Sequence, residues 1–158
     1  MLNSNLIYWK NNGTNSRIVS EIGNLIFQCE SVKIEIINDK YNIFIKHNNN
    51  NYHMILLKSY PFEIPQFVFF NNINYKKILL MNEPRINNYF KKYYGRDCFC
   101  CFSIFCKYNW KPTNNISDII NEINNTIKIK KEILLYILCD TIKNKYNCEF
   151  LYIIEYLF

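Results

Sequence analysis

Three short apolar segments, separated by turns rich in asparagine, constrain the fold of this chain more than any other feature. Residues 32–36 alternate strictly between apolar and polar side chains, and residues 41–45 and 52–57 repeat the pattern less cleanly. A period of two is typical of strands with one buried face. The intervening turns, at residues 38–39 and 47–51, consist largely of Asn and Asp, which favour tight hairpins. The sequence therefore predicts an antiparallel β-meander.

Segments with helical spacing flank the predicted meander. Residues 15–29 carry apolar side chains at helical spacing, and Ser16 can cap such a helix. Pro61 and Pro65 close the meander, and residues 66–70 are expected to form a fourth, short strand. Helical patterns resume after Pro112 in three segments, residues 116–123, 132–142 and 148–157, with Thr113 or Ser117 as the cap of the first. This order predicts an α+β fold with an N-terminal helix, an antiparallel meander of about four strands, and C-terminal helices on one side.

The length of the chain fits a single domain. A chain of 158 residues is close to the size of one standard domain. Residues 1–14 are expected to form a flexible N-terminal arm, and residues 15–158 one domain. Within it, residues 71–95 show no clean helix or strand period and are interrupted by Pro84. We interpret them as an irregular, mobile insertion with room for a short helix.

The composition favours neither a nucleic-acid nor a membrane partner. The chain has 26 Asn, 26 Ile and no Ala, a bias that AT-rich coding explains, and its net charge of +6 is spread along the sequence. Nucleic-acid binders normally gather basic residues on one strip. The first residues lack a signal-peptide pattern, and no apolar stretch approaches the roughly 20 residues of a membrane span. We therefore predict a soluble monomer in the cytoplasm and/or the nucleus.

The cysteines are expected to be reduced thiols. The chain has seven of them and no secretion signal, which argues against a disulfide framework. Several gather in the segment from Cys98 to Cys106, but a structural zinc site usually pairs a C-x2-C knuckle with a second knuckle or two histidines. Neither arrangement occurs, and His47 and His53 lie far upstream. The sequence therefore predicts no metal site and no cofactor.

Two motifs together carry a resemblance to a known family. The first is Tyr60-Pro61-Phe62-Glu63-Ile64-Pro65 followed by an apolar strand, and the second is Cys101 followed nine residues later by Trp110-Lys111-Pro112. The two motifs follow a predicted helix and meander and precede another predicted helix. With this order of elements, the chain resembles the ubiquitin-conjugating enzyme family. The resemblance covers roughly residues 15–140 and implies the fold of that family. Taken alone, either motif is compatible with a proline turn and a core aromatic.

The resemblance implies a function and a set of site residues. Cys101 would be the nucleophile that carries ubiquitin or a ubiquitin-like modifier as a thioester before its transfer to a lysine. The implied partners are this modifier, an activating enzyme and a ubiquitin ligase. In the family the ligase grips a patch that maps onto Phe62, Lys111 and Pro112.

The chain also departs from the family in two ways. No His-Pro-Asn precedes the cysteine, and the nearest equivalent, Glu83-Pro84-Arg85, places Arg85 where the family has the Asn credited with oxyanion stabilisation. Arg85 is therefore the candidate oxyanion donor, although its longer guanidinium would not reproduce a fixed amide. A neighbouring Asn is the alternative donor. The span from Phe62 to Cys101 is also longer than in the family, which suggests that the insertion at residues 71–95 controls access to Cys101.

Alternatives remain for the nucleophile and for the function. The segment from Gly95 to Cys98 is similar to the Gly-x-x-Cys pattern that ends at the family's active-site cysteine, so Cys98 is a candidate nucleophile. Cys100 is a further candidate. Residues 100–105 are mostly apolar and are expected to be buried. All three cysteines could therefore instead be small buried hydrophobic residues. The alternative function is a catalytically inactive variant, or an RWD-type module that binds proteins with the same fold.

Overall fold

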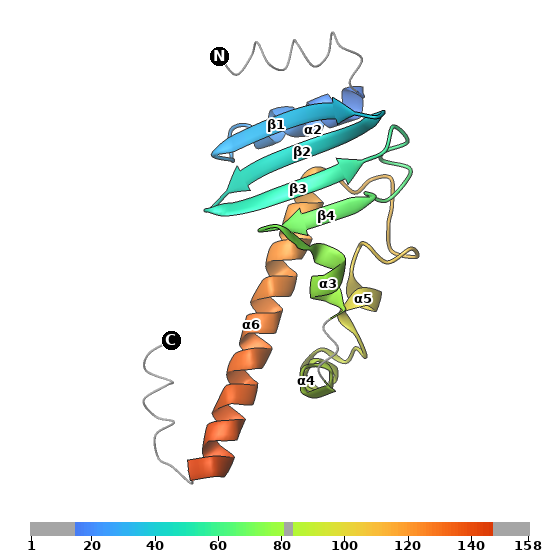
Figure 1. Cartoon of the computed structure of the whole chain (residues 1–158). Helices are drawn as coiled ribbons and strands as arrows, with labels where there is room; N and C mark the ends of the chain where they lie inside the picture. The colour runs from blue at the N-terminus through green and yellow to red at the C-terminus, as the bar shows by residue number, and fades with distance from the viewer. Residues whose placement is uncertain (1–14, 81–83, 147–158) are drawn as a thin grey trace.

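The computed structural model describes residues 15–80 and 84–146, and its centre is a five-stranded antiparallel sheet (Figure 1). The strands pair in chain order, which confirms the predicted meander. They are β1 (Ser31–Ile37), β2 (Lys40–His47), β3 (Asn50–Leu56), β4 (Phe67–Phe70) and the two-residue β5 (Ile73–Asn74). The fold is therefore α+β. Within these described residues, no helix has both the length and the apolar character needed to cross a membrane.

Pairs of Asn and Asp residues with positive φ form the turns of the meander. These residues are Asn38, Asp39, Asn48, Asn49, Asn71 and Asn72, with φ between 47° and 65°. This left-handed region disfavours most side chains, whereas Asn and Asp tolerate it. Two-residue turns of this kind suit the twist of paired strands. The turns thereby set a register in which Ile43 lies opposite Ile34 and Met54, all three of them buried.

Helix α2 (Ser16–Leu25) is the predicted N-terminal helix, although it is shorter than expected. Asn15, rather than Ser16, caps it, because the Asn15 side chain accepts a 2.9 Å hydrogen bond from the Arg17 N–H. Ile18 and Ile22 are fully buried. Figure 1 shows α2 and the first turns of the last helix on the same side of the sheet. The core lies between these helices and the sheet.

A single helix, α6 (Ile116–Tyr146), replaces the separate helices predicted at residues 116–123 and 132–142. Its 31 residues contain neither Gly nor Pro, so nothing in the sequence interrupts it. Asn115 is the cap instead of Thr113 or Ser117: its side chain accepts from the Asp118 N–H at 3.0 Å, and Asp118 accepts from the Asn115 N–H at 2.9 Å. The isoleucines of its first two turns are buried, as predicted. The helix predicted at residues 148–157 and the arm at residues 1–14 lie outside the described residues.

Residues 71–95, which were expected to be irregular with room for a short helix, are largely regular in structure. This segment contains β5, α3 (Tyr75–Leu79) and α4 (Pro84–Tyr94). Pro84 begins a helix here instead of interrupting one, because the first helical position needs no backbone N–H. Ile86 and Phe90, four residues apart, bury one face of α4. The abundance of polar and aromatic residues concealed this spacing in the sequence.

Candidate functional site

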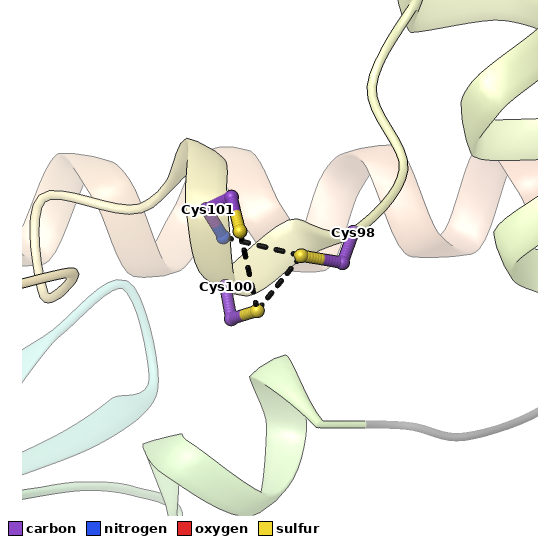
Figure 2. Close-up of side chains that lie close together, drawn as sticks. All are labelled: Cys98, Cys100 and Cys101. Carbon is purple, nitrogen blue, oxygen red and sulfur yellow. Dashed lines mark hydrogen bonds between the residues drawn. The ribbon is translucent and has the colours of Figure 1, made fainter.

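Three cysteine sulfurs converge at the start of α5 (Phe99–Phe102), a helix of one turn. The Sγ atoms of Cys98 and Cys100 are 2.8 Å apart, and those of Cys100 and Cys101 are 3.9 Å apart. The Cys98 sulfur also accepts the Cys101 N–H at 3.4 Å, so Cys98 caps the helix with its thiol. All three sulfurs lie within 4.8 Å of one another, and Figure 2 shows them pointing toward a common centre. We refer to Cys98, Cys100 and Cys101 as the cysteine cluster.

Phe99 anchors the cysteine cluster to the core. Its side chain is 4% exposed and stacks on Phe90 of α4 at a centroid distance of 3.9 Å. The Lys130 ammonium of α6 also lies over this ring, 4.8 Å from its centroid. Because one helical turn places Phe99 inward, the cysteines on either side of it in the sequence are held near the surface.

The cysteine segment is less buried than its apolar sequence indicates. Residues 100–105 were expected to be buried, yet Cys101 is exposed and Phe102 is 53% exposed. Cys98 and Cys100 are half-buried. The reason is the short helix, which turns only Phe99 and Ser103 fully inward. The interpretation of these cysteines as buried hydrophobic residues is therefore wrong for Cys101.

Hydrogen bonds within the cysteine cluster separate the pKa values of its thiols. The Cys98 sulfur accepts from the Cys100 thiol and from Cys101, which lowers the pKa of Cys98. The Cys100 thiol, as donor to Cys98, has a raised pKa. Hydrogen bonding to Cys98 and then to Cys100 raises the pKa of Cys101 to about 12. Cys98 is therefore the first of the three to ionise, whereas Cys101 is the most accessible.

A pocket of about 380 Å³ opens beside the cysteine cluster. Its wall is formed by the turn at residues 64–68, by helix α3 and by the cysteine segment; the cysteines that line it are Cys100, Cys101 and Cys106. Val68, Leu79 and Phe105 make much of the lining apolar. The pocket can hold a narrow apolar group or a short extended chain next to the exposed thiol.

The Tyr-Pro turn and the segment after the cysteines are joined by direct contacts. The Trp110 indole Nε1–H donates a 2.9 Å hydrogen bond to the Pro61 carbonyl, and the peptide bond before Pro61 is cis. The Asn109 side chain donates 2.9 Å hydrogen bonds to the carbonyl oxygens of Cys101 and Ser103. The two motifs that are separated in sequence thus form one unit around Cys101. Sequence reasoning did not single out Asn109, whose role depends on the fold of this loop.

The three residues assigned to a ligase patch all lie at the surface. Phe62 is 77% exposed, and Lys111 and Pro112 are exposed as well. They occupy adjacent segments, because Trp110, which precedes Lys111, bonds to Pro61, which precedes Phe62. Their exposure leaves them accessible to a partner, and the assignment to a ligase stays a prediction.

Arg85 lies in the first turn of α4 and is exposed. It belongs to a different helix from the cysteine cluster, and its assignment as oxyanion donor stays a prediction. Glu83, which completes the Glu-Pro-Arg segment, lies outside the described residues. The insertion places α3 against the pocket, since Tyr75 and Leu79 line it.

Sequence reasoning missed a buried polar group that supports the segment after the cysteines. The Tyr75 hydroxyl contacts Thr126 Oγ1 at 2.7 Å and donates to the Glu122 carboxylate at 3.2 Å. Glu122 also accepts from the Ile104 N–H at 3.3 Å. Burial raises the pKa of Tyr75, so its hydroxyl stays protonated at neutral pH. The i, i+4 spacing of Glu122 and Thr126 on α6 was the only signal for this group.

Lys130 is a second residue that the sequence did not reveal. It is 5% exposed, donates to the Ile78 carbonyl and packs over Phe99. Burial lowers its pKa to about 8. Lys130 therefore links α6 to both α3 and the anchor of the cysteine cluster.

Comparisons of the chain with protein-family models, with curated proteins and with solved structures found no match.

Proposed function

We propose that this chain is a divergent ubiquitin-conjugating enzyme that carries ubiquitin or a ubiquitin-like modifier as a thioester on Cys101. The observation that supports this most directly is the Trp110–Pro61 hydrogen bond of 2.9 Å, which joins the two family-like motifs around an exposed cysteine. The order of helix, meander, Tyr-Pro turn, cysteine and helix agrees with the fold that the resemblance implies. The proposal includes this ubiquitin-conjugating-enzyme fold.

The proposed chemistry consists of two acyl transfers. In the first, the Cys101 sulfur attacks the thioester carbonyl of a modifier held by its activating enzyme, a new C–S bond forms, and the activating enzyme's thiol leaves with the proton from Cys101. In the second, a substrate lysine amine attacks the Cys101 thioester, an amide forms, and Cys101 recovers its thiol. Neither step needs a metal or a cofactor, because activation by ATP precedes both.

The surroundings of Cys101 suit this reaction in two respects. The apolar pocket of about 380 Å³ offers a place beside the thiol for the narrow C-terminal tail of a modifier. Phe62 projects from a proline turn next to Lys111 and Pro112, and an exposed aromatic residue of this kind is a common interface anchor. Arg85 remains the candidate donor to the oxyanion of both transfers.

A protein-binding module without catalysis is the second candidate function. Two observations favour it: the raised pKa of Cys101 makes its thiol a poor nucleophile, and the family's His-Pro-Asn is absent. Such a module would use the exposed Phe62 surface without loading a modifier.

A loading assay distinguishes the two functions. The protein is incubated with activating enzyme, ATP and candidate modifiers, and adducts are separated on a non-reducing gel. We expect a reductant-sensitive adduct, which Cys101→Ser should convert into a reductant-stable oxyester. Cys106→Ser is the matched control, because Cys106 lines the same pocket and should load normally. Loading that survives Cys101→Ala would contradict the assignment of Cys101, and the absence of loading by every modifier would support the binding module.

A further inference from the structure

The cysteine cluster has the arrangement of a metal-binding site, which its sequence pattern did not predict. We propose that Cys98, Cys100 and Cys101 together bind one Zn²⁺ ion through their three sulfurs. The observation that carries this proposal is the convergence of the three Sγ atoms within 4.8 Å of one another. Sequence reasoning rejected zinc because a second knuckle is missing, but a single helical turn brings three ligands together without one.

The distances between the sulfurs are close to those that one zinc ion requires. Tetrahedral ligands at a Zn–S distance of about 2.3 Å are about 3.8 Å apart. Cys100 and Cys101 already have this separation, at 3.9 Å. The 2.8 Å between Cys98 and Cys100 must widen by about 1 Å, which side-chain rotation can supply because neither residue is fully buried. Figure 2 shows that the three side chains point inward from the helix start and from the residue before it.

The chemistry of the donors favours a thiophilic ion. Thiolate sulfur is a soft ligand that binds Zn²⁺ well and binds Mg²⁺ or Ca²⁺ poorly. Among the described residues, the group contains cysteines alone, so three thiolates and one open position would surround the metal. Cys101 is exposed, which leaves the fourth position to water or to an external ligand. The Cys101 N–H, 3.4 Å from the Cys98 sulfur, supplies the backbone hydrogen bond that commonly orients a metal ligand.

This proposal does not depend on the proposed conjugating activity. Zinc binding needs only the three thiols, and it can be measured without modifier, activating enzyme or ATP. Cys106 supplies an internal comparison, because it lines the same pocket but does not belong to the group of converging sulfurs.

Cobalt substitution tests the site directly. The untagged full-length protein, reduced and metal-free, is titrated anaerobically with Co²⁺, whose thiolate complexes absorb through sulfur-to-metal charge transfer. We expect one Co²⁺ per chain, a charge-transfer band with tetrahedral d–d bands, and displacement by one equivalent of Zn²⁺. Absence of the charge-transfer band would overturn the proposal, and so would a site that takes Cu⁺ but neither Co²⁺ nor Zn²⁺.

Single substitutions then assign the ligands. Cys98→Ser, Cys100→Ser and Cys101→Ser should each weaken zinc binding at least about tenfold, since even the loss of outer-shell partners costs this much. Cys106→Ser should bind as the wild type does. Circular dichroism establishes that each variant is folded. If one variant does not fold, the wild-type protein gives the same assignment. Bound Zn²⁺ should protect the cluster thiols against an alkylating reagent, and mass spectrometry measures the alkylation at each cysteine. Zinc binding that is weakened equally in Cys106→Ser, or cluster thiols that zinc does not protect, would contradict the assignment of these three ligands.

Discussion

The hydroxyl of Tyr60 donates a 2.7 Å hydrogen bond to the carboxylate of Glu21, although the two residues are 39 positions apart. The same carboxylate oxygen accepts the Ile116 N–H at 2.9 Å, and the other oxygen pairs with Arg17. Tyr60 belongs to the Tyr-Pro turn, Glu21 to α2 and Ile116 to the start of α6. One buried carboxylate thus connects α2 to the Tyr-Pro turn and to the start of α6.

Removal of the Tyr60 hydroxyl should destabilise the protein. In Tyr60→Phe the carboxylate of Glu21 loses a donor while remaining buried, so we expect the free energy of unfolding to fall by about 1–3 kcal/mol. Urea denaturation followed by circular dichroism measures this change. Tyr108→Phe is the control, because Tyr108 is 88% exposed, and it should change stability by less than about 0.5 kcal/mol. Equal stabilities of the two variants would show that the Glu21 contact contributes little.

Lys130 should make stability depend on pH in the alkaline range. Burial lowers its pKa to about 8, whereas a lysine in the unfolded chain titrates near 10.4. Between these values the unfolded state binds more protons, so the free energy of unfolding should rise with pH. Below about pH 8, Lys130 is protonated in both states and contributes no slope.

Lys130→Met provides the comparison, because it keeps a long apolar stem and removes the charge. The difference in stability between wild type and variant should change by on the order of 3 kcal/mol between about pH 7 and 10.4. Taking the difference cancels the titration of the tyrosines and cysteines that both proteins share. Parallel stability curves for the two proteins would exclude a lowered pKa for Lys130.

Phe99 should be essential for the geometry of the cysteine cluster. Phe99→Ala removes a buried ring that stacks on Phe90, so we expect a loss of about 3–5 kcal/mol in stability. We also expect Co²⁺ binding to weaken, because the helical turn that gathers the sulfurs loses its anchor. Phe102→Ala is the matched control on the same turn. Its ring is 53% exposed, and its loss should cost less than about 1 kcal/mol and leave Co²⁺ binding unchanged.

Zinc should inhibit modifier loading if both proposals hold, because Cys101 would serve as metal ligand and as nucleophile. Saturation of the protein with Zn²⁺ should abolish the thioester adduct, and removal of the metal by a chelator should restore it. A separate conjugating enzyme in the same reaction controls for inhibition of the activating enzyme by zinc. Normal loading of a chain whose cobalt spectrum shows an occupied site would mean that Cys101 does not have both roles.

The sequence predicted the sheet well because its signals are local. Alternation in residues 32–36 and positive-φ Asn and Asp residues in the turns act within a few positions, and the pairing of strands in chain order follows from them. The helices of the insertion were missed for a different reason. Their buried faces, such as Ile86 and Phe90, are short and depend on packing against α6, which no local pattern reveals.

The candidate site was predictable only in part. The two motifs that carry the resemblance contact each other, because the Trp110 indole donates a hydrogen bond to the Pro61 carbonyl. The role of Cys101 as nucleophile stays a prediction. The convergence of the three sulfurs was not predicted, because residues 100–105 were interpreted as a buried apolar segment. A strand would place neighbouring side chains on opposite faces, whereas a helical turn capped by Cys98 gathers them.

The length of α6 gives the molecule two parts with different resistance to local opening. Its 31 residues span about 46 Å, and in Figure 1 the helix extends well beyond the sheet. The isoleucines of the first turns are buried between α2 and the sheet. The distal turns pack against α4 through contacts such as the stacking of the Tyr93 and Tyr136 rings. Amide hydrogens at the two ends of one continuous helix should therefore exchange with solvent at very different rates. Lys130, which packs over Phe99, lies between these two parts of the helix.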